Sequence, residues 1–104
     1  MSWVYLFLAG LFEIGWALGL KLSEGFSKPW ATTFTIVSLV ISMSLLGMAL
    51  RTLPLGTAYA IWTGIGAVGI AIVGMIWFGD GVSAVRIACI AMIVTGIVGL
   101  KLSA

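Results

Sequence analysis

The chain has 104 residues, of which 62% are hydrophobic and 8% are charged, and its mean hydropathy is +1.29. A soluble domain of this length carries about three times as much charge, so the composition indicates an integral membrane protein, and a net charge of +2 is too small and too dispersed to indicate a nucleic-acid partner. With no histidine, and with Cys89 as its single cysteine, the sequence predicts no disulfide, no metal site and no cofactor.

Polar residues divide the chain into four apolar segments. We expect helices at about 3–20, 30–50, 55–78 and 84–100, which together form one all-α transmembrane domain over residues 1–104. Each segment has about the 20 residues that a bilayer-spanning helix needs, and only short connections remain between them. Four short helices barely enclose a polar pathway, so the sequence predicts an oligomer.

The basic residues are divided almost evenly between the two ends of the predicted helices. Arg51 and Lys101 lie at the end that carries the N-terminus, whereas Lys21, Lys28 and Arg86 lie at the other end. The positive-inside rule needs a clear bias to set one orientation. We therefore expect insertion in both orientations, the alternative being that features other than charge select one.

Glu13 is the most informative residue of the first span. Apolar sequence flanks it from Trp3 to Leu20, and at ~1.5 Å per residue it lies ~15 Å from the end near Trp3, close to the bilayer midplane. Placing an ionisable group there costs a few kcal/mol, so such a residue is usually functional. The alternative is a glutamate near the end of a shorter, soluble helix.

The face that carries Glu13 also carries small residues and an indole. Ala9, Gly10, Trp16 and Ala17 share this face by their helical spacing. Small residues let a second helix approach closely. The indole N–H of Trp16, one turn away, is in a position to donate to the Glu13 carboxylate.

The second and fourth spans carry fewer polar groups. Ser42 lies near the middle of the second span, where a serine usually bonds a carbonyl of its own helix. The fourth span offers no functional polar group. Its small residues Cys89, Gly96 and Gly99 form an edge suited to helix packing.

The third span places Tyr59, Trp62, Thr63 and Gly66 along one side. The Tyr59 O–H and the Trp62 N–H need partners inside a membrane, and a buried carboxylate is the expected one.

The same span contains a glycine pattern, G-x-G-x-x-G, formed by Gly64, Gly66 and Gly69. No strand precedes this pattern and no acidic residue follows at a suitable distance, so it does not predict a dinucleotide site. We expect it to provide close packing and a flexible point in the helix.

Together, one carboxylate, two indoles, a phenol and a hydroxyl form a small hydrogen-bonding site. Desolvation and hydrogen bonding act in opposite directions on a carboxylate, and their balance lets it hold either a proton or a cation. One site with two competing ligands is the minimum for proton-coupled exchange, and aromatic rings favour cations. Nothing resembles a nucleophile–base pair or a phosphate cradle, so we do not expect an enzyme.

These residues resemble the small multidrug resistance transporters over essentially the whole chain. The likeness lies in the four short spans, in Glu13, in the highly specific run Gly56–Gly66 (GTAYAIWTGIG), and in Gly96. Within the family, the run Glu13–Trp16 (EIGW), Ser42 and the run Gly99–Lys101 look like the guanidinium exporter subtype. Polyaromatic-cation exporters usually lack a tryptophan three residues after the glutamate.

The resemblance implies an antiparallel, dual-topology homodimer in the bacterial inner membrane that exports guanidinium in exchange for protons. Glu13 would bind both cation and proton, with the two carboxylates sharing one site. The residues that would orient this carboxylate and tune its pKa are Trp16, Ser42, Tyr59 and Trp62, with Tyr59 also an element of side-to-side switching. The packing and bending glycines would be Gly10, Gly64, Gly66, Gly69 and Gly96.

Two features depart from the usual pattern of this subtype, namely Gly15 and the Asp80-Gly81 turn. Two alternatives stay open. One is a multidrug exporter of quaternary ammonium or polyaromatic cations on the same fold, against which Trp16 and Ser42 argue. The other is a non-transporting membrane subunit that buries one carboxylate, although such subunits are typically two-helix hairpins without an aromatic cage.

Overall fold

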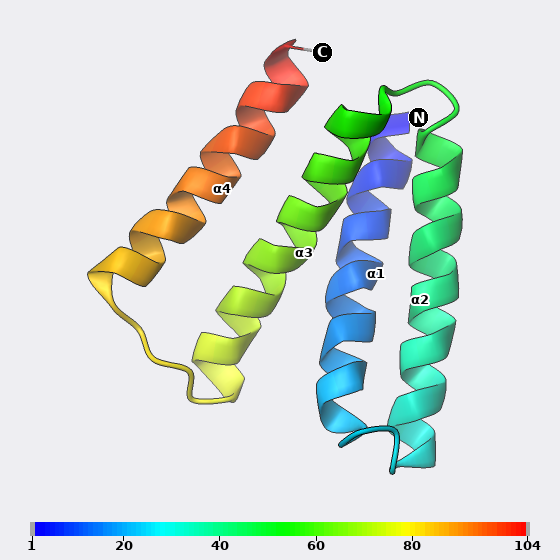
Figure 1. Ribbon diagram of the computed structural model, residues 1–104, viewed down its shortest axis with the longest axis vertical. Helices are drawn as coiled ribbons and strands as arrows, with labels where there is room; N and C mark the ends of the chain where they lie inside the picture. Colours follow the sequence, from blue (N-terminus) through cyan, green and yellow to red (C-terminus); the bar gives the residue numbers. More distant parts are fainter. Residues whose placement is uncertain (1, 104) are drawn as a thin grey trace.

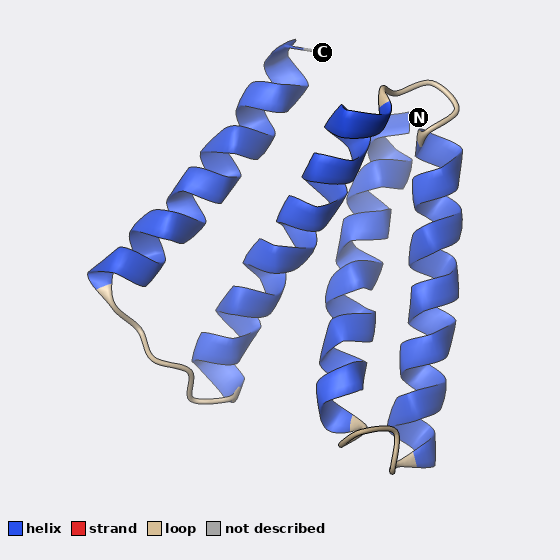
Figure 2. Ribbon diagram, viewed as in Figure 1, coloured by secondary structure: helices blue, strands red, loops and turns tan. Residues whose placement is uncertain are grey.

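The computed structural model describes residues 2–103, which form four helices joined by short connections (Figure 1). The helices are α1 (Ser2–Leu22), α2 (Pro29–Ala49), α3 (Leu55–Trp77) and α4 (Ala84–Ser103). Figure 2 shows helices and loops only, with no strand within residues 2–103. The prediction of an all-α chain is therefore confirmed.

Each helix is long and apolar enough to cross a membrane. The helices have 20 to 23 residues, which at ~1.5 Å per residue matches a hydrocarbon core ~30 Å thick. Their most apolar windows have mean hydropathies between 1.6 and 2.0. The helices run up and down in turn, so the start of α1, the α2–α3 turn and the end of α4 lie at one end (Figure 1).

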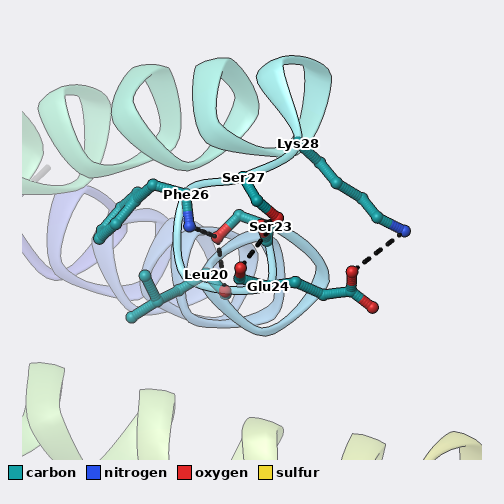
Figure 3. Close-up of polar contacts among 6 residues, drawn as sticks. All are labelled: Leu20, Ser23, Glu24, Phe26, Ser27 and Lys28. Carbon is teal, nitrogen blue, oxygen red and sulfur yellow. Dashed lines mark hydrogen bonds and ion pairs between the residues drawn. The ribbon is translucent and has the colours of Figure 1, made fainter.

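The connection between α1 and α2 is a compact turn built around the fully buried Ser23 (Figure 3). The Ser23 hydroxyl donates to the Leu20 carbonyl at 2.8 Å and accepts from the Phe26 backbone N–H at 3.2 Å. Residues 24–26 all have positive φ, which reverses the chain within a few residues. The exposed side chains of Lys28 and Glu24 form a salt bridge at 3.5 Å.

Helix α1 packs against both α2 and α3, and small residues set how closely these helices approach. A methyl group at position 10 would lie 2.6 Å from Ile65 Cγ2 of α3, and one at position 69 would lie 2.5 Å from Ile14 Cγ1 of α1. Gly10 and Gly69 therefore leave the space in which isoleucines of the facing helix lie. The result is a tight α1–α3 interface around the middle of the membrane span.

Helix α4 stands apart from the other three. Among the described residues, α4 packs against α3 alone. A contact with α1 is made by Lys101, whose Nζ lies 5.2 Å from the centre of the Trp3 ring. A methyl group at position 64 of α3 would lie 3.0 Å from Ile97 Cγ1, so Gly64 brings α4 close to α3. No residue of Ala84–Ser103 is buried, and no described atom lies within 4 Å of a methyl group at Gly96.

The protomer is flat, with extents of 41 × 35 × 16 Å. Its thin dimension exceeds the diameter of a single helix with side chains, ~10–12 Å, by only a few ångströms. A thin layer of helices of this kind cannot surround a solute by itself. The antiparallel homodimer stays a prediction, and α4 leaves a broad apolar surface available to lipid or to another helix.

Candidate functional site

Glu13 lies near the middle of α1 and points against α3. A methyl group at position 66 would lie 2.7 Å from Glu13 Cγ and closer still to its carboxylate. The carboxylate therefore lies in the space that any side chain at position 66 would take. Gly66 is the residue that lets an ionisable group rest against the backbone of α3.

An open groove of about 210 Å³ surrounds this carboxylate. Its lining comes from two helices, with Glu13, Trp16 and Ala17 from α1 and Thr63, Gly66, Ala67 and Ile70 from α3. Glu13 is the single ionisable side chain in that lining. Among the described residues, buried Glu13 Oε1 and buried Trp16 Nε1 both lack a hydrogen-bond partner. Two residues that line the groove thus each hold a buried polar atom, one acceptor and one donor, that no described group pairs.

The hydrogen bond expected between Trp16 and Glu13 is therefore not formed within residues 2–103. Spacing along α1 places the two residues one turn apart, but it does not fix the rotamer of the indole. The two side chains nevertheless line one groove. Ala67 and Ile70 were not singled out from the sequence, although they follow Thr63 at four and seven residues and so lie on its face.

A second polar cluster links α1, α2 and α3. The Ser42 hydroxyl of α2 donates to the Ala9 carbonyl of α1 at 2.7 Å, and Trp62 Nε1 of α3 donates to Ser42 Oγ at 3.0 Å. Ser42 is fully buried and Trp62 is 6% exposed. Trp62 thus bonds a serine, where the sequence had suggested a carboxylate, and Ser42 bonds a neighbouring helix where an own-helix carbonyl is usual.

This cluster supports the turn of α1 that carries Glu13. In an α-helix the carbonyl of residue 9 accepts the backbone N–H of residue 13. The Ser42 hydroxyl therefore bonds the carbonyl that also anchors the Glu13 backbone. Ser42 and Trp62 are positioning residues, because they act on Glu13 through Ala9 and α1.

Tyr59 lies at the outer side of the same cluster. Its ring centre is 5.5 Å from that of Trp62, with the ring planes tilted by 58°, and the residue is 54% exposed. This tilted arrangement is a favourable one for aromatic pairs. The structure thus gathers the predicted residues into two neighbouring groups, with Glu13, Trp16 and Gly66 in the groove and Ser42, Trp62 and Tyr59 beside it.

Replacing Ser42 by alanine is expected to lower the free energy of unfolding by about 1–2 kcal/mol, because the buried Trp62 N–H loses its acceptor. The matched control is Ser44→Ala, since Ser44 is exposed and its hydroxyl bonds Val40 in its own helix at 2.8 Å. Denaturant titrations in detergent micelles, followed by tryptophan emission, measure both variants. Equal stabilities would show that the three-helix cluster contributes nothing.

Comparison with known proteins identifies the family. Residues 1–93 match the family model described as Small Multidrug Resistance protein. A guanidinium exporter of Salmonella typhimurium is 56% identical over 104 residues, covering 100% of this chain and 99% of the relative. The guanidinium exporter of Escherichia coli K12 is 52% identical over 103 residues, covering 99% and 98%. One from Citrobacter freundii is 50% identical over 103 residues, again covering 99% and 98%. The chain therefore belongs to the small multidrug resistance family of multi-pass membrane transporters.

Proposed function

We propose that this protein exports guanidinium across the bacterial inner membrane in exchange for protons, with Glu13 as the group that binds either one. The observation that carries this proposal is the lone carboxylate in a mid-membrane groove, with a buried oxygen that no described group satisfies. Relatives that are at least half identical over the full length are named guanidinium exporters, which supports the choice of cargo.

A carboxylate of this kind performs exchange by competition. A planar cation with several N–H groups satisfies both oxygens of an ionised carboxylate, whereas a protonated carboxyl has lost the charge that attracts the cation. Binding of one ligand therefore requires departure of the other. If the site opens to one side of the membrane at a time, this competition couples outward movement of the cation to inward movement of protons.

The size of the groove favours a small cation. Its volume of about 210 Å³ lies below the range of about 300–1,000 Å³ that is usual for drug-sized ligands. Guanidinium has a single carbon and three nitrogens and needs little room. Such a cation fits within the groove of one protomer, and the transport test below distinguishes it from the bulky cations of the multidrug alternative.

The proposal includes an antiparallel homodimer. The groove is open along one face of a flat protomer, so a second copy is needed to separate it from lipid and to bring two Glu13 carboxylates together. The near-equal division of basic residues between the two ends supports insertion in both orientations. The close approaches at Gly64, Gly66 and Gly69 leave α3 with little side-chain bulk at its centre, where we expect it to bend during alternating access.

The test is a transport measurement on the pure protein in liposomes. Addition of guanidinium should move protons across the membrane in the opposite direction, recorded as a current or as a change of internal pH. A polyaromatic cation at the same concentration should give a much smaller signal. A response to the polyaromatic cation alone would contradict the proposed cargo, and silence with both cations would contradict transport by this chain alone.

A further inference from the structure

A second groove continues the first toward the membrane surface. It has a volume of about 120 Å³ and lies at the end of the molecule that holds the α1–α2 and α3–α4 connections. Ala17 and Ile70 line both grooves, so the two grooves adjoin along α1 and α3 on the way from the surface to Glu13, and we call the pair the path to Glu13. Glu13, Ala17 and Lys21 follow each other at four-residue intervals on α1, which places Lys21 ~12 Å from Glu13 along the helix axis.

The outer end of this path holds a carboxylate, an aromatic ring and an ammonium group. Asp80, Phe78 and Lys21 all line the outer groove. The Asp80 side chain folds back onto α3, with Cγ 3.2 Å from the place of a methyl group at Gly74, and its backbone N–H bonds the Gly74 carbonyl at 3.0 Å. Asp80 is thereby held at the mouth of the path.

The ammonium group of Lys21 occupies the place of a cation in this groove, next to an aromatic ring. Its Nζ lies 5.7 Å from the centre of the Phe78 ring, within the ~6 Å over which a cation is attracted to a ring face. Among residues 2–103, however, the one salt bridge within 4.0 Å is that between Lys28 and Glu24. The Asp80 carboxylate is therefore not closed off by a direct ion pair with Lys21.

We infer that Asp80 and Phe78 form an outer binding site for planar cations at the mouth of the path to Glu13, where an arriving guanidinium displaces the Lys21 ammonium. Guanidinium suits this pair better than an ammonium does, because it can present two parallel N–H groups to a carboxylate and stack its plane on a ring. This inference rests on the proposed function, since it supplies the cation that Glu13 then binds.

The site has a defined kinetic consequence. A negative charge at the mouth raises the local concentration of cations without touching the exchange step at Glu13. Replacing Asp80 by asparagine should raise the guanidinium KM about fivefold at low salt and leave kcat nearly unchanged. At ~1 M sodium chloride, where screening acts within ~3 Å, the difference should nearly vanish. Asp80→Glu should restore most of the lost affinity.

Glu24→Gln is the matched control. It removes the same charge at the same end of the molecule, from an exposed residue in the α1–α2 connection that lines neither groove. Its KM should stay at the wild-type value. Equal KM changes in Asp80→Asn and Glu24→Gln would overturn the inference, because they would show a general effect of surface charge.

A binding measurement separates this inference from the proposed function. In Glu13→Gln protein the central site is lost, so line broadening of isotope-labelled guanidinium in nuclear magnetic resonance reports the outer site alone. The broadening should persist in Glu13→Gln and in Glu13→Gln/Glu24→Gln, and it should disappear in Glu13→Gln/Asp80→Asn. Absence of broadening in Glu13→Gln overturns the outer site, whether or not the wild-type protein transports guanidinium.

Discussion

Replacing Glu13 by glutamine is expected to abolish guanidinium transport together with the proton movement coupled to it. Glutamine keeps the shape of the side chain, but it neither carries the charge that pairs with the cation nor takes up and releases a proton. Removing one partner of a buried ion pair costs about 3–5 kcal/mol, so guanidinium transport at low substrate should fall by at least about 100-fold. Proton flux driven by a guanidinium gradient in liposomes measures both losses.

Glu24→Gln is again the appropriate control, because it removes a carboxylate that lies outside the four helices. This variant should transport guanidinium at the wild-type rate. Far-ultraviolet circular dichroism should show equal helix content in both variants, so that loss of transport cannot be attributed to unfolding. Coupled transport that persists in Glu13→Gln would contradict the central role of this carboxylate.

The sequence predicts the helices of this fold well because their physical cause is local. A run of about 20 apolar residues must satisfy its own backbone hydrogen bonds in a membrane, and only a helix does so within one segment. Proline, glycine and charged residues then mark the connections. The predicted segments 30–50 and 55–78 accordingly differ from α2 and α3 by one residue at most at either end.

The position of Glu13 is predictable for the same reason, since it depends only on the length of the segment before it. The partners of the other polar groups are not local. Whether Ser42 reaches the Ala9 carbonyl depends on how α2 is rotated and on how closely it approaches α1. Ala9 is fully buried and has only a methyl side chain, which permits this approach. The sequence pattern identifies the residues, but it does not establish these distances.

The outer groove gives a second example of what tertiary structure adds. Lys21 and Asp80 are 59 positions apart in the chain, and each is an ordinary charged residue next to a membrane span. The folding of Asp80 onto Gly74 and the packing of α1 on α3 place the two side chains in one groove. The spacing of these two residues along the chain alone does not suggest this arrangement.

Among single substitutions in the groove, Gly66→Ala is expected to give the largest loss of guanidinium transport for the smallest change in the free energy of unfolding. The added methyl group takes the space of the Glu13 side chain from Cγ to the carboxylate, so this flexible side chain must adopt another rotamer. The free energy of unfolding should therefore change by less than about 1 kcal/mol, the usual gain of alanine over glycine in a helix. A displacement of about 1 Å at a binding group can cost about 100-fold in rate, so guanidinium transport should fall by about that factor.

The matched control is Gly47→Ala in α2, because no described atom lies within 4 Å of a methyl group there. Both variants make the same substitution inside a helix, but only the change at position 66 displaces the carboxylate. Liposome transport and denaturant unfolding should be measured for both, with Gly47→Ala expected to match the wild-type protein in transport. If Gly66→Ala transports guanidinium normally, then Glu13 does not bind its cation from the position against α3, and the groove between α1 and α3 is not the transport site.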